Sequence, residues 1–289
     1  MENSKNNFPL GEDGENVDQV HGNRFVGSIV VAARSGGKGK TTTAQVIAHQ
    51  LRSTDISVDI YSLDASTDES VSKLRHVLPE TKDLRFGASM KDVVENPAAA
   101  LDHFDEIGAI MSKGGALFDF GANVAPVFFG WAAVSGLSEI HGEIPPLTLV
   151  IPVTASSVSI ADAAEIIADA RKSIDELPVK KVIVVYNERD GGFSSQVAGY
   201  DDLKRLEKGR DANFEITSIV MPLLPKINAT FWNNIEIHEM SYRAVLEMNA
   251  EALTKKLDMV GMTAARGKIA LKKWLDTVVQ AFTDVGLTS

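Results

Sequence analysis

One stretch near the N-terminus constrains the fold more than any other. Residues 34–43 read Arg-Ser-Gly-Gly-Lys-Gly-Lys-Thr-Thr-Thr, between an apolar, β-branched run at 28–33 and a further run at 44–51. The first run is typical of a buried parallel strand, and the second indicates a helix. A glycine-rich loop between a strand and a helix favours phosphate binding, because its backbone N–H groups can crowd round the phosphate oxygens. We therefore expect the chain to fold around a phosphate-binding loop.

Each residue type in this loop has a defined task. Lys40 would place an ammonium on the β- and γ-phosphates, and the Thr41 hydroxyl would ligate Mg²⁺. The positive end of the helix dipole adds to the attraction of anions. The predicted phosphate-binding residues are Gly36, Gly37, Lys38, Gly39, Lys40, Thr41 and Thr42.

The loop departs from the strict P-loop spacing. That spacing requires a glycine five residues before Gly39, and Arg34 stands there. The match is to the variant GGxGK[ST]T pattern. A glycine-rich surface loop beside a basic pair is the alternative interpretation. The strand before the loop and the helix after it favour phosphate binding.

A second informative stretch spans residues 115–123, Gly-Ala-Leu-Phe-Asp-Phe-Gly-Ala-Asn. An apolar strand that ends in an aspartate, with a glycine two residues later, is the Walker B and switch II pattern. The Asp119 carboxylate would accept hydrogen bonds from Mg²⁺-bound water, and the Gly121 N–H would approach a γ-phosphate. Asp-x-Gly alone indicates only a turn, but its position after a phosphate loop gives it weight. The triplet Asp-Phe-Gly does not indicate a protein kinase, because the other kinase motifs are absent.

A third candidate lies at the end of the predicted strand 58–63. Asp64 follows this strand, and the carboxyl edge of an open α/β sheet is where ligands bind. The alternative is that this residue caps a helix starting near Glu69.

The remaining pattern predicts the fold class. Apolar strands at 147–153, 181–186 and 215–220 alternate with helical segments. We expect a doubly wound, mostly parallel α/β sheet flanked by helices, as in P-loop NTPases. Residues 24–289 would form one domain with C-terminal helices, and residues 1–23 a disordered acidic tail. The stretch 125–137 is apolar on nearly every face, so we expect either a buried helix or an interface.

Composition excludes several classes of protein. The 289 residues include no cysteine, which excludes disulfides, Cys-ligated zinc and iron–sulfur clusters. No run of 18 apolar residues occurs, and no apolar signal core opens the chain, so we expect a cytoplasmic protein without membrane insertion. The net charge of −10 disfavours nonspecific nucleic-acid binding by the surface as a whole.

The C-terminal region differs locally from this acidic average. Leu271, Leu275, Val278 and Phe282 share one helical face and predict docking onto the sheet. Between positions 254 and 273 six basic residues accompany a single acid, Asp258. This cluster indicates either a solvated helix face or a DNA-binding patch. Its members are Lys255, Lys256, Arg266, Lys268, Lys272 and Lys273.

The loop Gly-Gly-Lys-Gly-Lys-Thr-Thr resembles that of the ParA/MinD family, the deviant Walker A P-loop ATPases. The sequence Asp-Phe-Gly-Ala-Asn at 119–123 resembles the StbB-like plasmid stability and transfer branch of this family. Ser35 resembles the same branch, because it stands where the family otherwise has its signature lysine. In the family that lysine reaches the phosphates of the partner in an ATP-sandwiched dimer. Either Arg34 or Lys38 could supply the charge here.

The resemblance also implies roles for further residues. Asp64 would orient the attacking water and lie in the outer Mg²⁺ shell. Asn187 would read the adenine edge, and Pro222 would belong to the loop that packs on the adenine ring. The C-terminal basic residues would bind nonspecific DNA in the ATP-bound dimer.

These observations predict Mg²⁺-dependent ATP binding and slow hydrolysis to ADP. Hydrolysis would time the exchange between a homodimer that holds a partner or adaptor protein and a monomer that releases it. The resemblance implies a role in plasmid partition, stability or transfer. Two alternatives remain open, a metabolic P-loop ligase or kinase and a nucleotide-binding adaptor with little hydrolysis. Ser35 favours the adaptor, whereas Lys40, Thr41, Asp64 and Asp119 favour catalysis.

Overall fold

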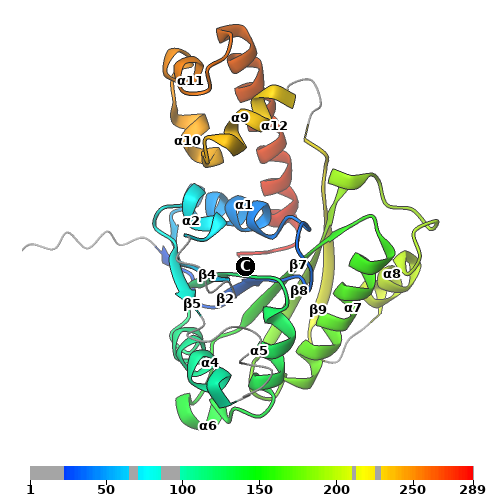
Figure 1. The fold of residues 1–289 in the computed structure, drawn as a ribbon. Helices are drawn as coiled ribbons and strands as arrows, with labels where there is room; N and C mark the ends of the chain where they lie inside the picture. The colour runs from blue at the N-terminus through cyan, green and yellow to red at the C-terminus, as the bar shows by residue number, and fades with distance from the viewer. Residues whose placement is uncertain (1–22, 65–70, 86–97, 210–212, 225–228, 289) are drawn as a thin grey trace, which may run out of the picture.

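The computed structural model describes residues 23–64, 71–85, 98–209, 213–224 and 229–288 (Figure 1). The tail predicted at the N-terminus lies outside these ranges except for Asn23. The helix expected near Glu69 begins outside them as well.

A parallel sheet forms the centre of the described part of the chain. It has seven strands in the order β5-β4-β6-β2-β7-β8-β9, and every neighbouring pair is parallel. The predicted doubly wound, mostly parallel α/β fold is therefore confirmed. The strands are β2 Ser28–Val31, β4 Asp59–Asp64, β5 Lys82–Arg85, β6 Ala116–Phe120, β7 Leu147–Thr154, β8 Val179–Asn187 and β9 Glu215–Met221. A separate short pair joins β1 Asn23–Arg24 to β3 Ile56–Ser57.

The inner strands are apolar because both faces of the sheet are covered. All residues of β2 and β6 are buried, as continuous β-branched and aromatic runs predict for a parallel sheet. β2 lies between β6 and β7, with Val31 opposite both Asp119 and Val150. The loop that follows β2 therefore emerges at the middle of the carboxyl edge.

Helices cover both faces of the sheet, and a separate hydrophobic core lies on each face (Figure 1). One core packs the sheet against α4, α5, α7 and α8, with α6 beside them, and the other packs it against α1, α2 and the C-terminal helices. The first group is α4 Ala98–Met111, α5 Val124–Ala132, α6 Leu137–His141, α7 Ser157–Lys172 and α8 Tyr200–Lys208. The second is α1 Lys40–Ser53, α2 Lys73–Val77, α9 Ala229–Ile237, α10 Tyr242–Glu247, α11 Ala250–Lys256 and α12 Gly261–Asp284.

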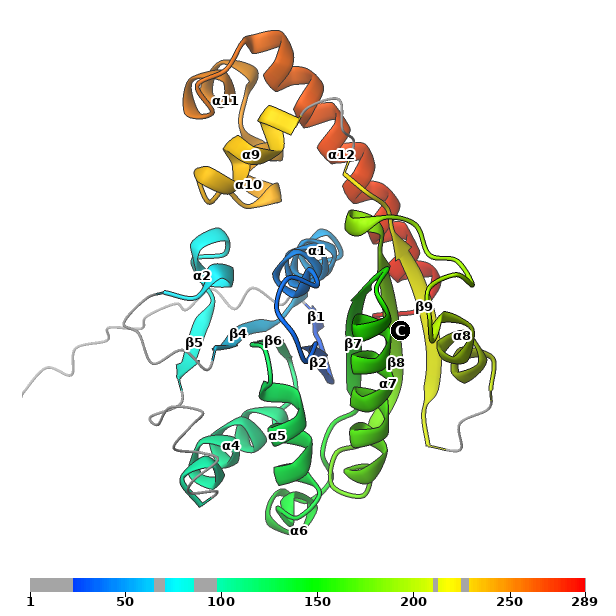
Figure 2. The same ribbon diagram turned by 45° about the vertical axis from the view of Figure 1, so that its right-hand side comes forward.

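The final helix joins the sheet to a projecting helical unit (Figure 2). Leu271, Leu275, Val278 and Phe282 are buried against α1 and the sheet, so the predicted docking face of α12 is confirmed. The first half of α12 carries α9, α10 and α11 away from the sheet. At Gly267 an added Cβ would lie 2.3 Å from the ring of Phe231, so the absence of a side chain allows α9 to pack closely.

The apolar stretch at 125–137 is core, as one of its two interpretations expected. Phe128, Phe129 and Trp131 are buried in the first core. The stretch is not a single helix, because α5 ends at Ala132 and α6 begins after Gly136, whose φ is +63°.

Within the ranges described above, no helix is both long and apolar enough to cross a membrane.

Candidate functional site

The loop between β2 and α1 is shaped by two glycines. Gly37 and Gly39 have φ values of +72° and +93°, a region that side-chain-bearing residues rarely adopt. Gly39 is also the N-cap of α1, and it offers no side chain to the first-turn N–H groups. These N–H groups and the positive end of the helix dipole therefore face the loop, which is the arrangement an anion needs.

Two of the residues predicted to hold Mg²⁺ lie in contact at the base of the loop. Thr41 Oγ1 donates to Asp119 Oδ2 at 3.1 Å, although the two residues lie 78 positions apart. Asp119 is only 6% exposed on β6. Lys40 Nζ donates to the Ser35 carbonyl at 3.1 Å, so its ammonium lies across the loop. A hydroxyl and a carboxylate side by side are hard oxygen donors, and these suit Mg²⁺ held directly by Thr41 and through water by Asp119.

Backbone contacts place the segment after β6 against the loop. The Gly121 N–H donates to the Leu63 carbonyl at 2.6 Å, and the Asn123 N–H donates to the Arg34 carbonyl at 3.0 Å. Asn123 itself has a left-handed φ of +64° at the start of α5. Asp64, the last residue of β4, lies at the same carboxyl edge, since Leu63 is paired with Phe120. The predicted water-positioning role of Asp64 stays a prediction.

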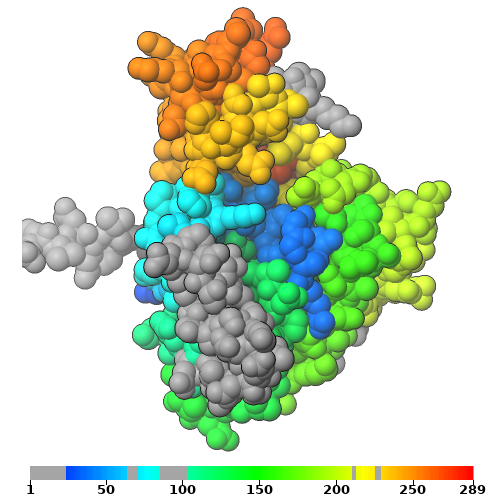
Figure 3. Space-filling view, viewed as in Figure 1, coloured from blue at the N-terminus to red at the C-terminus, as the bar shows by residue number. Residues whose placement is uncertain are grey.

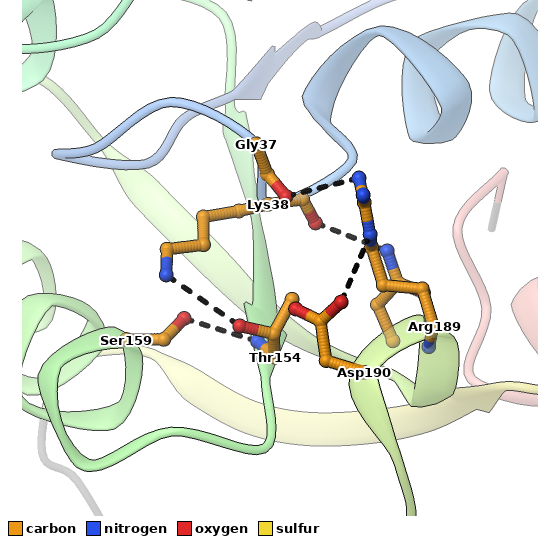
Figure 4. Close-up of polar contacts among 7 residues, drawn as sticks. Gly37, Lys38, Thr154, Ser159, Arg189 and Asp190 are labelled. Atoms are coloured by element: carbon orange, nitrogen blue, oxygen red, sulfur yellow. Dashed lines mark hydrogen bonds and ion pairs between the residues drawn. The ribbon is translucent and has the colours of Figure 1, made fainter.

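On its other side the loop is fastened to the end of β8 (Figure 4). Asn187 Nδ2 donates to the Lys38 carbonyl at 3.1 Å, and Asn187 Oδ1 accepts from the Arg189 N–H at 3.2 Å. Arg189 Nη1 donates to the Gly37 carbonyl at 3.2 Å. Lys38 Nζ reaches toward Thr154 Oγ1 at 3.5 Å. The Asn187 carboxamide therefore holds the loop, and its predicted contact with adenine stays a prediction.

The N-terminal part of the loop is held by α7, which the sequence did not indicate. Arg34 forms ion pairs with Glu165 at 2.6 Å and Asp169 at 2.7 Å. The Ser35 hydroxyl donates to Asp162 Oδ2 at 2.9 Å. The three acids are spaced three and four positions apart and so share one face of α7. That spacing was the available signal, but it does not reveal what stands opposite.

A cavity of about 640 Å³ opens beside the loop, between α1 and the C-terminal helices. Figure 3 shows the corresponding face, with the blue loop and α1 below the yellow and orange helices. Pro222 lines this cavity, as the predicted base-contacting role requires. The lining also includes Thr41, Thr42, Gln45, Arg189, Met221, Trp232, Met240, Tyr242 and Trp274.

Tyr242 links the two walls of the cavity. Its hydroxyl forms a side-chain hydrogen bond with Thr42, on the first turn of α1. Burial raises the pKa of Tyr242 to about 12. Trp274 Nε1 donates to the Pro222 carbonyl at 2.8 Å, so a second aromatic side chain of the C-terminal unit fixes the loop after β9.

The predicted basic cluster lies on α11 and α12. Lys255, Lys256, Arg266 and Lys273 are exposed. Lys268 donates to the Met248 carbonyl, and the exposed Lys272 pairs with Asp276 at 2.7 Å. Two of the six charges are therefore engaged within the C-terminal helices.

Among the described residues, no three His, Asp or Glu side chains are grouped so as to hold a metal ion by themselves.

No protein-family model matches the chain, and no curated protein matches it. Solved structures do. McdA from Cyanothece, in an ATP complex of a variant, is 14% identical, with 86% of this chain and 97% of that chain covered and a TM-score of 0.43. MinD from Pyrococcus horikoshii with Mg-ADP is 13% identical, with 91% and 98% covered and a TM-score of 0.43. MinD from Aquifex aeolicus is 15% identical, with 83% and 96% covered and a TM-score of 0.40. The fold class follows from the strand order and the loop.

Proposed function

We propose that this protein is a Mg²⁺-dependent ATPase of the ParA/MinD type, which binds ATP, hydrolyses it slowly and acts in plasmid partition, stability or transfer. The observation that carries the proposal is the 3.1 Å contact between Thr41 Oγ1 and Asp119 Oδ2 at the base of a glycine loop. It brings a hydroxyl and a carboxylate, two groups that would suit Mg²⁺, together beside the uncapped first turn of α1, and this supports the proposal.

In this proposal the residues of the site have separate roles in binding and hydrolysing ATP. Backbone N–H groups of the loop and Lys40 bind the phosphates and offset the charge that develops on them. Thr41 and Asp119 hold Mg²⁺, which supplies further positive charge when bound. Asp64, at the same edge of the sheet, orients the attacking water and accepts its proton.

Phosphate release and nucleotide binding test this proposal together. Wild type should release phosphate slowly from Mg-ATP. Lys40→Ala should lose at least about tenfold in ATP affinity, since it removes a charge-assisted contact to phosphate. Asp64→Asn should bind ATP normally and turn over about a hundredfold more slowly. Lys113→Ala, an exposed lysine before β6 at the opposite edge of the sheet, is the matched control. Equal ATP binding by wild type and Lys40→Ala would reject the proposal.

Contacts around the loop bear on how a second copy would be bound. Arg34 is engaged by two carboxylates of α7, whereas Lys38 has a 3.5 Å contact with Thr154. This supports Lys38 as the cation that meets phosphates across an ATP-dependent homodimer. Lys38→Ala should then abolish the dimer while leaving ATP affinity within about twofold, as light scattering and nucleotide titration would report.

One observation favours the adaptor with little hydrolysis. Ser35 stands where the resembled family has its signature lysine, and the Ser35 hydroxyl donates to Asp162. The adaptor predicts tight ATP binding with no turnover above that of Lys40→Ala, in the same phosphate-release assay.

Five exposed cations on α11 and α12 support nonspecific DNA as a partner of the ATP-bound form, and of these only Lys272 is paired with an acid of the described residues, Asp276. Replacing Lys255 and Lys256 with glutamate should then weaken DNA binding and flatten its dependence on salt. Unchanged binding in a mobility-shift titration would exclude this patch.

A further inference from the structure

One side chain in the wall of the cavity carries a buried hydrogen-bonding atom that has no partner among the described residues. Gln45 lies on α1, is 9% exposed and lines the cavity. No donor among the residues that the structure describes reaches its Oε1 atom. A buried carbonyl oxygen without a donor is unfavourable, so a ligand that brings an N–H group to this oxygen would gain affinity.

The position of Gln45 indicates which part of a nucleotide it meets. It follows Thr41 by four residues and Thr42 by three, so the three side chains share one face of α1. One helical turn advances about 5.4 Å along the axis. With phosphates at the first turn, Gln45 lies on the part of the wall that faces the nucleoside.

The neighbouring walls suit a planar base. Trp232, Tyr242 and Trp274 come from the C-terminal helices, and Met221 and Met240 add two thioethers. The rings of Tyr242 and Trp274 pack edge to face, with centroids 5.7 Å apart. Flat, polarisable side chains bind a heterocyclic ring through its faces and leave its polar edge to be satisfied separately.

The more obvious carboxamide is already engaged. Asn187 Nδ2 donates to the Lys38 carbonyl of the loop, and Asn187 Oδ1 accepts from the N–H of Arg189, two residues further along, so both ends of the amide already have a partner. Gln45 Oε1, by contrast, accepts no hydrogen bond from the described residues.

We infer that Gln45 accepts a hydrogen bond from the 6-amino group of adenine and thereby sets the preference for ATP over 6-oxo purine triphosphates. The inference rests on the proposed function, since it assigns the base-selecting residue of the same site. A site that pairs with a particular N–H discriminates against an analogue lacking it, because the buried acceptor is then left without a donor.

Competition against a fluorescent ATP analogue tests the assignment. ATP and inosine triphosphate, which carries an oxygen in place of the 6-amino group, are titrated with Mg²⁺ into the full chain. Wild type should prefer ATP by about tenfold or more. Gln45→Leu should lose about tenfold in ATP affinity and bind the two triphosphates nearly equally. Gln45→Met, closer in length, provides a second variant if the leucine disturbs folding.

Gln50→Leu is the matched control. Gln50 is also buried on α1, but its Nε2 donates to Thr283 and it lies outside the cavity lining. This variant should keep the wild-type preference for ATP.

Three results would overturn the inference. An unchanged ATP preference in Gln45→Leu and Gln45→Met excludes the contact. Equal losses for ATP and inosine triphosphate place it on the sugar instead of the base. No binding of either triphosphate by folded wild type rejects the proposed function along with the inference, whereas the first two results leave that function standing.

Discussion

Gly39 is the residue at which the phosphate loop, α1 and the end of β8 meet. Its φ of +93° turns the chain into α1, and a Cβ at this position would lie 2.4 Å from Asn187 Nδ2. Asn187 in turn donates to the carbonyl of Lys38. The glycine therefore permits both the turn and the side chain that holds the turn in place.

Gly39→Ala should destabilise the protein by about 1–3 kcal/mol, because it places a Cβ in a left-handed conformation and displaces the Asn187 amide. Urea unfolding measures this change. Gly36→Ala is the control, since a Cβ there meets no atom within 4 Å and its φ is not positive. If both variants unfold at the same urea concentration, the loop conformation at Gly39 is not the one described here.

Tyr242 makes folding sensitive to alkaline pH. Its pKa is about 12 in the folded protein and about 10 in the unfolded chain, because burial disfavours the phenolate. The unfolded state therefore releases the proton first. The resulting stabilisation of the native state is complete below pH 10 and is lost as the pH rises toward 12.

Tyr242→Phe should remove this part of the pH dependence. At pH 11.5 the variant should have lost about 2 kcal/mol less stability than wild type, relative to each protein at pH 9. Some alkaline loss should remain, because burial also raises the pKa of Tyr186. Chemical denaturation at the two pH values measures the difference. Parallel losses in the two proteins would show that Tyr242 is not buried as described.

Arg34 connects the phosphate loop to α7. The side chain of this arginine binds Asp169 and Glu165, while its carbonyl accepts from the Asn123 N–H at the start of α5. Since Lys40 donates to the next carbonyl along, that of Ser35, the position of α7 bears directly on the phosphate-binding lysine.

A double-mutant cycle on Arg34 and Asp169 should give a coupling energy of about 1–2 kcal/mol, because both side chains are largely buried. The exposed pair of Arg205 and Asp202 on α8 is the control and should show almost none. A coupling for Arg34 and Asp169 as small as that of the control would mean that α7 does not hold the loop. Thermal or urea unfolding of the variants supplies the energies.

The main elements could be predicted because their signals are local. An apolar strand, a glycine loop and a helix follow one another within residues 28–51, and Asp119 ends its own apolar strand. Parallel pairing then brings strand ends to one edge, so the proximity of Thr41 and Asp119 followed from topology alone.

The contacts that refine the site could not be predicted in the same way. Arg34 and Asp169 lie 135 positions apart, and Asn187 and Lys38 lie 149 apart. Helical spacing shows that the acids of α7 share a face, but the rotation of α7 relative to the loop depends on packing of the whole core. The unused oxygen of Gln45 is visible only once the cavity around it exists.

The cavity lies between two parts of the molecule, so a nucleotide in it would touch both. Thr42 comes from α1 beside the sheet, and Tyr242 and Trp274 come from the C-terminal helices. A contact at 2.9 Å between His76 Nδ1, in α2, and Glu239 Oε2, after α9, also spans this junction. We expect bound nucleotide to set the position of α9–α12 relative to the sheet, and with it the orientation of the exposed cations on α11 and α12.

Molar mass measured by light scattering tests most directly whether the loop operates a nucleotide-dependent switch. Wild type, Lys40→Ala and the control Lys113→Ala would be compared with ADP and with a nonhydrolysable ATP analogue plus Mg²⁺. The account predicts about 31.1 kDa with ADP for all three proteins, and about twice this mass with the analogue for wild type and Lys113→Ala only. A mass that nucleotide leaves unchanged, in wild-type protein shown to bind it, would contradict the switch.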